Sequence, residues 1–191
     1  MTFMGGVEAV HDIEAEVTTS GYRVSGIVRT RFDRIASILN SIDHSYLVIE
    51  NVTIRELDDE ATSWSAASAT VPLDEILFLA ASLPGASSMD AIVVPKRPFA
   101  ATVGLPPFRL AGTMYMPESI ESPATVITVN PDAFIVMTDV SVSCPAHPAL
   151  DAAYPVVAFQ RRRVHVFSVG MPATPAPAPA GDDPRHGIDW G

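Results

Sequence analysis

The chain contains an internal duplication, in which residues 13–80 reappear in altered form at residues 99–168. The matching blocks are 22–26 (YRVSG) with 108–112 (FRLAG), 46–52 (YLVIENV) with 134–140 (FIVMTDV), and 76–79 (ILFL) with 164–167 (VHVF). The first pair is offset by 86 positions (22 against 108) and the other two by 88 (46 against 134, 76 against 164). Three apolar blocks in one order indicate a two-module protein rather than a short-period solenoid.

The duplication predicts four segments along the 191-residue chain. We expect a first module at 1–82, a linker at 83–98, a second module at 99–170 and an Ala/Pro-rich tail at 171–191. A module of about 70 residues is near the lower limit for a self-sufficient core. Because 48% of the residues are hydrophobic and the mean hydropathy is +0.25, we expect the modules to bury surface against each other or against a partner.

Composition also restricts the surroundings and the partners. No uninterrupted apolar run approaches the ~20 residues that cross a bilayer, so we expect no membrane insertion. The N-terminus lacks the basic and apolar regions of a secretion signal, and the single cysteine, Cys144, fits a reducing cytoplasm. The net charge of −10 repels a phosphate backbone at long range, so nucleic acid is not expected as a partner.

The residue pattern is mostly that of β-strands. Residues 13–17 and 22–28 alternate around a Ser-Gly pair and predict a hairpin. Residues 46–54 predict another strand, and residues 69–79 predict one or two more. Residues 32–40 place apolar side chains at helical spacing, whereas the prolines of 117–123 leave room for one turn at most. We therefore expect mainly β structure with one short helix, in the first module.

Five short strands with an optional helical turn are typical of a small barrel of the SH3 or Sm type. In the first module, residues 26–28 (GIV), 37–40 (SILN) and 46–52 (YLVIENV) resemble the first Sm motif, and 71–79 (VPLDEILFL) resemble the last two strands of that barrel. The same residues also resemble a group of uncharacterised small bacterial domains. The resemblance implies two tandem small β-barrels that assemble through their edge strands. Where the Sm family has an Arg-Gly RNA pocket, this chain has Leu73, Asp74 and Glu75.

A nucleotide-binding alternative comes from a second barrel family, the PilZ domains. Residues 51–53 (NVT) and 139–141 (DVS) resemble the start of its ligand-binding strand. Arg29, Arg31 and Arg34 would then be the ligand-binding arginines, although their spacing differs from the Arg-x-x-x-Arg element of that family. A cleft lined by these three arginines would favour a regulatory module that binds a nucleotide or another small ligand.

Catalytic and metal chemistry find little support in the sequence. Cys144 and His147 have a spacing that could supply two zinc ligands, with His165 as a third, but a structural zinc site needs four. There is no nucleophile elbow, no phosphate loop and no dinucleotide fingerprint. We therefore expect no enzyme activity, no metal and no cofactor.

One difference between the repeats suggests how the modules associate. Asp74 and Glu75 in the first repeat align with Arg162 and Arg163 in the second at the 88-residue offset. Opposite charges on equivalent strands favour pairing of unlike modules, within one chain or between chains. We therefore expect these four residues to lie at an interface, with Arg161, Arg162 and Arg163 on a strand.

The tail adds a second candidate contact. Alternating Ala and Pro at 172–180 make a semi-rigid spacer, which ends in a segment that contains Ile188 and Trp190. An aromatic anchor on a spacer is typical of a docking peptide. The sequence as a whole predicts a non-catalytic structural or accessory subunit that scaffolds an oligomer or a larger complex.

Overall fold

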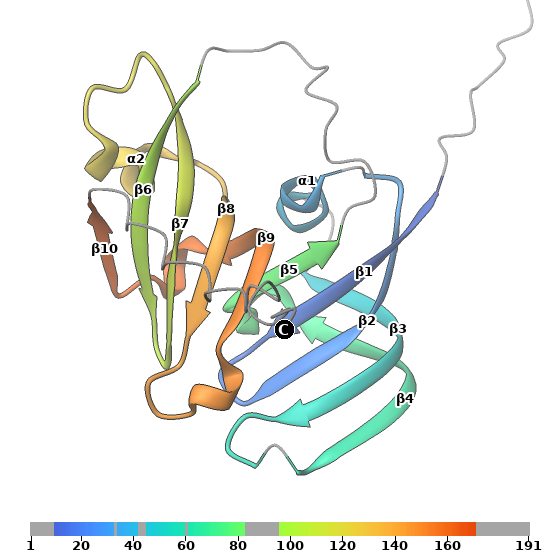
Figure 1. The fold of residues 1–191 in the computed structure, drawn as a ribbon. Helices are drawn as coiled ribbons and strands as arrows, with labels where there is room; N and C mark the ends of the chain where they lie inside the picture. The colour runs from blue at the N-terminus through green and yellow to red at the C-terminus, as the bar shows by residue number, and fades with distance from the viewer. Residues whose placement is uncertain (1–9, 33, 42–44, 60, 83–95, 171–191) are drawn as a thin grey trace, which may run out of the picture.

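The computed structural model describes residues 10–32, 34–41, 45–59, 61–82 and 96–170, and shows a mainly β protein (Figure 1). The strands are β1 (His11–Thr18), β2 (Tyr22–Thr30), β3 (Tyr46–Glu56), β4 (Ser63–Pro72), β5 (Phe78–Ser82), β6 (Lys96–Leu105), β7 (Phe108–Pro117), β8 (Phe134–Ser143), β9 (Ala152–Gln160) and β10 (Val166–Val169). Two short α-helices are α1 (Ile35–Asn40) and α2 (Val126–Val129). Four 3-10 turns are η1 (Leu73–Glu75), η2 (Pro123–Thr125), η3 (Pro148–Leu150) and η4 (Arg161–Arg163).

The ten strands form one antiparallel sheet in the order β10-β6-β7-β8-β9-β5-β1-β2-β3-β4. The first half of the protein, β1 to β5, pairs in the order β5-β1-β2-β3-β4, and the second half, β6 to β10, pairs in the equivalent order β10-β6-β7-β8-β9. Pairing of β5 with β9, hereafter the junction, joins the halves. The mainly β prediction is confirmed, but the strands form one sheet that is not closed into a barrel, so the expected pair of tandem SH3- or Sm-type barrels is not confirmed.

The same backbone hydrogen bonds recur in the two halves. Leu73 N–H donates to the Ser45 carbonyl at 3.0 Å, and Arg161 N–H, 88 positions later, donates to the Ala133 carbonyl at 2.8 Å. Each bond ties the 3-10 turn after the fourth strand of a half to the residue before its third strand. The duplicated sequence blocks therefore fold into duplicated connections as well as duplicated strands.

A glycine in the second strand of each half makes room for a bulge in the third. A Cβ atom on Gly26 would lie 2.6 Å from the carbonyl oxygen of Glu50, and one on Gly112 would lie 2.8 Å from that of Thr138. The residue at the bulge, Asn51 or Asp139, has a φ of 52° in each case. Asn and Asp tolerate this left-handed conformation better than other non-glycine residues, which accounts for the Asn/Asp that the PilZ comparison singled out.

The two halves exchange core residues across the junction. Phe78 on β5 is fully buried in the core of the second half, while Phe134 on β8 and Ala158 on β9 pack into the core of the first. Phe78 also meets Phe108 edge to face, with ring centroids 5.3 Å apart. Each half is thus completed by apolar side chains of the other, as expected for modules of this size.

Several sequence predictions of local structure need correction. The first helix is shorter than residues 32–40, and a second helix, α2, follows Pro123, so the described residues of each half include a short helix. Arg161, Arg162 and Arg163 form the 3-10 turn η4 rather than part of a strand. The fourth strand begins at Ser63, well before residue 69, because small polar residues give a weak strand signal. The short strand expected at 92–94 lies outside the described residues.

Candidate functional site: the open edges of the sheet

The two ends of the sheet are β4 and β10, each of which pairs on one side only within the described residues. We call the unpaired sides of these strands the open edges. Neither strand contains a charged residue: β4 reads SWSAASATVP and β10 reads VFSV. Soluble proteins commonly protect edge strands with charges, so two uncharged edges are suited to pairing with another strand.

Equivalent residues of the two halves differ in exposure according to whether their edge is covered. Phe78 opens β5, which the junction covers, and its side chain is fully buried. Val166 opens β10 at the equivalent position, 88 residues later, and is 62% exposed. The apolar side chain at this position therefore packs into a core in one half and faces solvent in the other.

Apolar side chains also gather near the open edge of β4. Trp64 on β4 and Tyr22 on β2 are each 44% exposed and pack edge to face, with ring centroids 5.9 Å apart. They line a groove of about 370 Å³ whose other lining residues include Val71, Pro72 and Glu75. This open edge thus has an aromatic, largely apolar surface beside its unpaired backbone.

The junction shows how a covered edge is built in this protein. Phe78, Leu79 and Ala80 of β5 pair with Phe159, Ala158 and Val157 of β9. Gln160 extends the pairing, because its N–H donates to the Leu77 carbonyl at 2.9 Å and its side-chain amide donates to the Leu73 carbonyl at 2.6 Å. The buried pairs are apolar, and polar groups at the end of the strand pair fix its register.

Charged residues at the end of the junction connect the two halves. Arg163 in η4 donates through Nε to the Asp74 carbonyl at 3.0 Å, and its Nη2 donates to the same oxygen and lies 3.5 Å from Glu75 Oε1. The sequence comparison paired these segments by their opposite charges, and the structure brings Arg163 to Asp74 and Glu75 within one chain. Arg162 is exposed, and no contact of its side chain is observed within the described residues. A role of these residues toward a partner stays a prediction.

A polar cluster lies on the other side of the junction. Tyr154 of β9 donates its hydroxyl hydrogen to Glu16 of β1, and Arg23 Nε lies 3.4 Å from Glu16 Oε1. Arg23 also donates to the Leu150 carbonyl at 3.0 Å, so it links both halves. Burial, together with the hydrogen bond to Glu16, raises the pKa of Tyr154 above the value of an exposed tyrosine. The cluster holds the halves together in one arrangement.

Of the three arginines of the nucleotide-binding alternative, two line the same groove and the third does not. Arg29 and Arg31 line a groove of about 470 Å³ beside β3, whereas Arg34 is exposed ahead of α1 and does not line it. Arg29 lies 3.1 Å from Asp12 and 3.5 Å from Glu50, which raise its pKa and balance its charge. The guanidinium of Arg31 lies 5.4 Å from the ring centroid of Phe32. The groove between the two halves is instead lined by Glu14 and Glu16.

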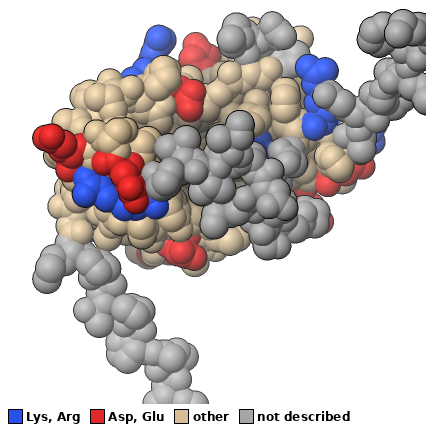
Figure 2. Space-filling view, turned by 90° about the horizontal axis from the view of Figure 1, so that it is seen from above, with Lys and Arg blue, Asp and Glu red and all other residues tan. Residues whose placement is uncertain are grey.

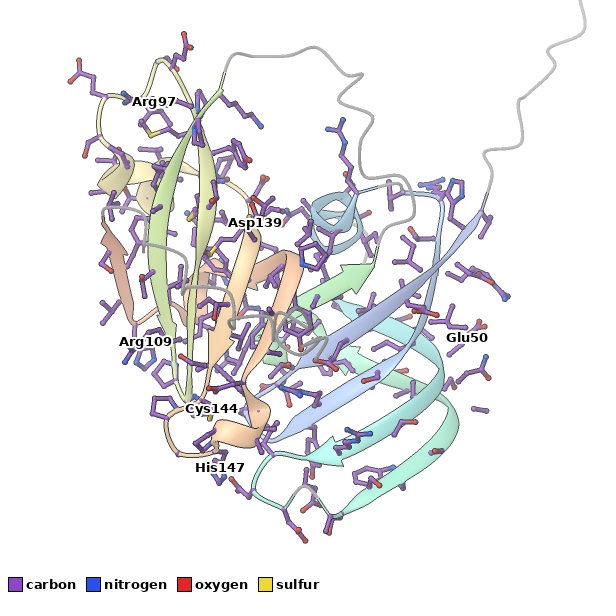
Figure 3. All side chains as sticks on the ribbon, viewed as in Figure 1. Glu50, Arg97, Arg109, Asp139, Cys144 and His147 are labelled. Atoms are coloured by element: carbon purple, nitrogen blue, oxygen red, sulfur yellow. The ribbon has the colours of Figure 1, made fainter. Side chains whose placement is uncertain are left out.

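The Cys-His pair lies in the connection between β8 and β9 (Figure 3). Cys144 is buried, and its N–H donates to Asp151 at 2.7 Å, while His147 Nε2 lies 4.0 Å from Asp58. His165 lies just before β10, and its N–H donates to the Gly104 carbonyl. Among the described residues no group of three or more His, Cys, Asp or Glu side chains could hold a metal ion.

Charged side chains on the visible face form small mixed groups. Figure 2 shows Lys and Arg beside Asp and Glu rather than one broad basic area on this face. In the described part of the chain, no helix has the length and apolar character needed to span a membrane. Ile188 and Trp190, the residues of the predicted docking peptide, lie outside the described residues.

Comparison with known proteins assigns no family. No protein-family model, no curated protein and no solved structure matches the chain. The open edges are the feature that the sequence interpretation located only in part. The signal that could have found β4 is the run of uncharged residues from Ala61 to Leu73, which is long for a surface segment.

Proposed function

We propose that this protein is a non-catalytic assembly subunit, which joins neighbouring polypeptides by adding their strands to its open edges. The observation that carries the proposal is the exposure of Val166, an apolar residue whose equivalent in the other half, Phe78, is fully buried by a paired strand. Backbone pairing supplies affinity along an edge strand, and the side chains beside it supply specificity. The chain's single cysteine and acidic composition fit a cytoplasmic assembly of this kind.

We also propose that each half is a small partly open barrel of the SH3 or Sm kind. Support comes from the strand order 5-1-2-3-4 within each half and from the 3-10 turn between the fourth and fifth strands. In such a unit the fourth and fifth strands do not pair with each other, which leaves two edges for assembly. The junction uses one edge from each half and leaves one edge from each half open.

The regulatory alternative has weaker support from the same surfaces. An anionic ligand would need arginines that are not already neutralised, and Arg29 lies beside two carboxylates. The residues that line the groove between the halves include Glu14 and Glu16 but no Lys or Arg, which disfavours a nucleotide there. We therefore propose the assembly function alone.

Site-specific photo-crosslinking in the native cell tests this function. A benzophenone amino acid is placed at Val166 on β10, at Thr70 on β4 and, as a control, at Tyr115 on β7, which is 48% exposed and lies on an interior strand that pairs on both sides. We expect discrete crosslinked species at 166 and 70 and none at 115. Equal, weak crosslinking at all three positions would show that the edges are not covered in the cell, and would overturn the proposed function.

A further inference from the structure

We propose that the polypeptide covering each open edge is a second copy of this chain, with β10 of one copy paired antiparallel to β4 of the next. This inference rests on the proposed function and specifies its partner. The reason is that the junction already joins the equivalent strands within one chain: β5 is the equivalent of β10, and β9 is the equivalent of β4. The protein therefore contains one such strand pair within the chain, and its open edges supply the two strands for another pair between copies.

The junction also gives the register of the pairing between copies. Phe78 pairs with Phe159 in the junction. The residue equivalent to Phe78, 88 positions later, is Val166, and the residue equivalent to Phe159, 88 positions earlier, is Val71, so Val166 is expected opposite Val71. By the same conversion, Phe167 pairs with Thr70, and Ser168 pairs with Ala69. These residues are uncharged, and a one-residue shift would turn every side chain to the other face, so this register is strongly preferred.

The side chains at the new contact are suited to burial. Val166 would take the place of Phe78, which inserts into the core of the adjacent half, and lose its 62% exposure. Residues 65–70 of β4 are Ser, Ala and Thr only, so another strand can approach closely. The apolar groove of Trp64 and Tyr22 lies beside this stretch and extends the covered surface.

Charge at the end of the strands favours this pairing over its alternatives. In the junction, Arg163 on the β9 side meets Glu75 on the β5 side. Between copies the available charges are those of Asp74, which follows β4, and Arg162, which precedes β10, because both side chains are exposed while Arg163 and Glu75 already meet within the chain. Antiparallel pairing of β4 with β10 brings these opposite charges to the same end of the contact, whereas antiparallel pairing of β4 with β4 would leave the two acidic segments at opposite ends, each without a basic partner from the other copy.

One difference makes the contact between copies weaker than the junction. Gln160 donates two hydrogen bonds across the junction, but its equivalent on β4 is Pro72, which has neither a backbone N–H nor a side-chain amide. The carbonyl of His165, equivalent to that of Leu77, therefore loses its donor. We therefore expect the junction to form within each chain, and the weaker contact between copies to form afterwards.

The pairing is head to tail, because a copy offers one edge of each kind. A contact of this kind does not end in a two-fold symmetric dimer, and continues until the copies close a ring or form a filament. A variant with one damaged edge cannot associate with itself. Two variants damaged at opposite edges still share one intact contact, and therefore form a pair that cannot grow.

The experiment measures the mass of the full-length chain by light scattering over a range of concentrations. The wild type is compared with Val166→Lys, which places a charge on β10, and with Thr70→Lys, which places one on β4; both residues are exposed. We expect the wild type to exceed the 20.3 kDa of one chain, each variant alone to remain at that mass, and their equimolar mixture to reach twice that mass. Tyr115→Lys on the interior strand β7 introduces the same charge at an exposed position that is not on an edge strand, and should assemble like the wild type.

Other outcomes overturn the inference in distinguishable ways. A wild type that stays at 20.3 kDa at every concentration, or a mixture that does not pair, shows that the partner is not a second copy. If crosslinks at Val166 in the cell then carry a different protein, the proposed function stands and only this inference fails. If Val166→Lys and Thr70→Lys assemble as well as the wild type, assembly uses another surface and both fail.

Discussion

The side-chain amide of Asn40 hydrogen-bonds both backbone groups of Phe134, 94 positions further along the chain, as a neighbouring strand would. Asn40 Nδ2 donates to the Phe134 carbonyl at 2.9 Å, and Phe134 N–H donates to Asn40 Oδ1 at 2.9 Å. Asn40 ends α1 in the first half, and Phe134 opens β8 in the second. The pair therefore fixes the position of α1 against the other half, next to the junction.

Replacement of Asn40 by Ala should destabilise the protein by about 2 kcal/mol, because it leaves a partly buried N–H and C=O without partners. Urea unfolding of the full-length chain measures the change. Asn130→Ala is the matched control, since Asn130 Oδ1 accepts only an exposed local bond from Asp132 N–H. A loss of similar size in both variants would show that the Asn40–Phe134 pair is not what holds α1 in place.

Stability should fall at high pH because of Tyr154. Its pKa in the folded state is raised by burial and by the hydrogen bond to Glu16, whereas the unfolded chain titrates near the ordinary value of about 10. Between these two values the unfolded state loses a proton that the folded state keeps, so the free energy of unfolding falls as pH rises, by up to about 1.4 kcal/mol per pH unit. It is unchanged by this group below pH about 9.

Denaturant titrations at pH 8 to 11 measure this dependence for the wild type and for Tyr154→Phe. The Phe variant lacks the hydroxyl group and should show a shallower decline. Tyr115→Phe is the control, since Tyr115 is 48% exposed. Parallel curves for the wild type and Tyr154→Phe would contradict a raised Tyr154 pKa.

Alanine at either bulge glycine should destabilise the sheet. A Cβ atom on Gly26 or Gly112 would lie 2.6 Å or 2.8 Å from a backbone carbonyl oxygen of the adjacent strand, and backbone atoms cannot move aside cheaply. We expect a loss of about 2 kcal/mol for each. Gly21→Ala is the control, because nothing lies within 4 Å of its added Cβ, and it should be neutral or slightly stabilising. Thermal unfolding of the three variants is the measurement; equal melting temperatures for Gly26→Ala and Gly21→Ala would contradict the close approach.

Removal of the Arg163 side chain should weaken the junction more than removal of its neighbour. Arg163→Ala loses the hydrogen bonds to the Asp74 carbonyl and the contact with Glu75, at a cost of about 1 kcal/mol for a partly exposed group. Arg162→Ala changes the net charge equally and removes no contact within the described residues, so its free energy of unfolding should match the wild type. Measurement at a protein concentration where the chain is monomeric separates this effect from assembly. A larger loss for Arg162→Ala would contradict the assigned contacts.

Local features of the fold follow from particular residues. The hairpin predicted from the alternation at 13–17 and 22–28 is confirmed as β1 and β2, and the strand predicted at 46–54 is confirmed within β3. Gly26 and Gly112 align in the duplicated blocks because each faces a bulge in the next strand. Residues 63–68 escaped prediction, because Ser and Ala carry little strand preference and this part of β4 is stabilised by its pairing with β3.

The sequence by itself determined the mainly β character, the duplication and the order of the apolar blocks, since these depend on alternation and spacing along the chain. Only the tertiary structure decided which edges are covered. Phe78 and Val166 are apolar residues at equivalent positions, and the neighbouring sequence does not indicate that the first is buried and the second is exposed. The difference arises because β5 pairs with β9 of the other half, a contact between residues about 80 positions apart whose choice depends on the packing of both cores together.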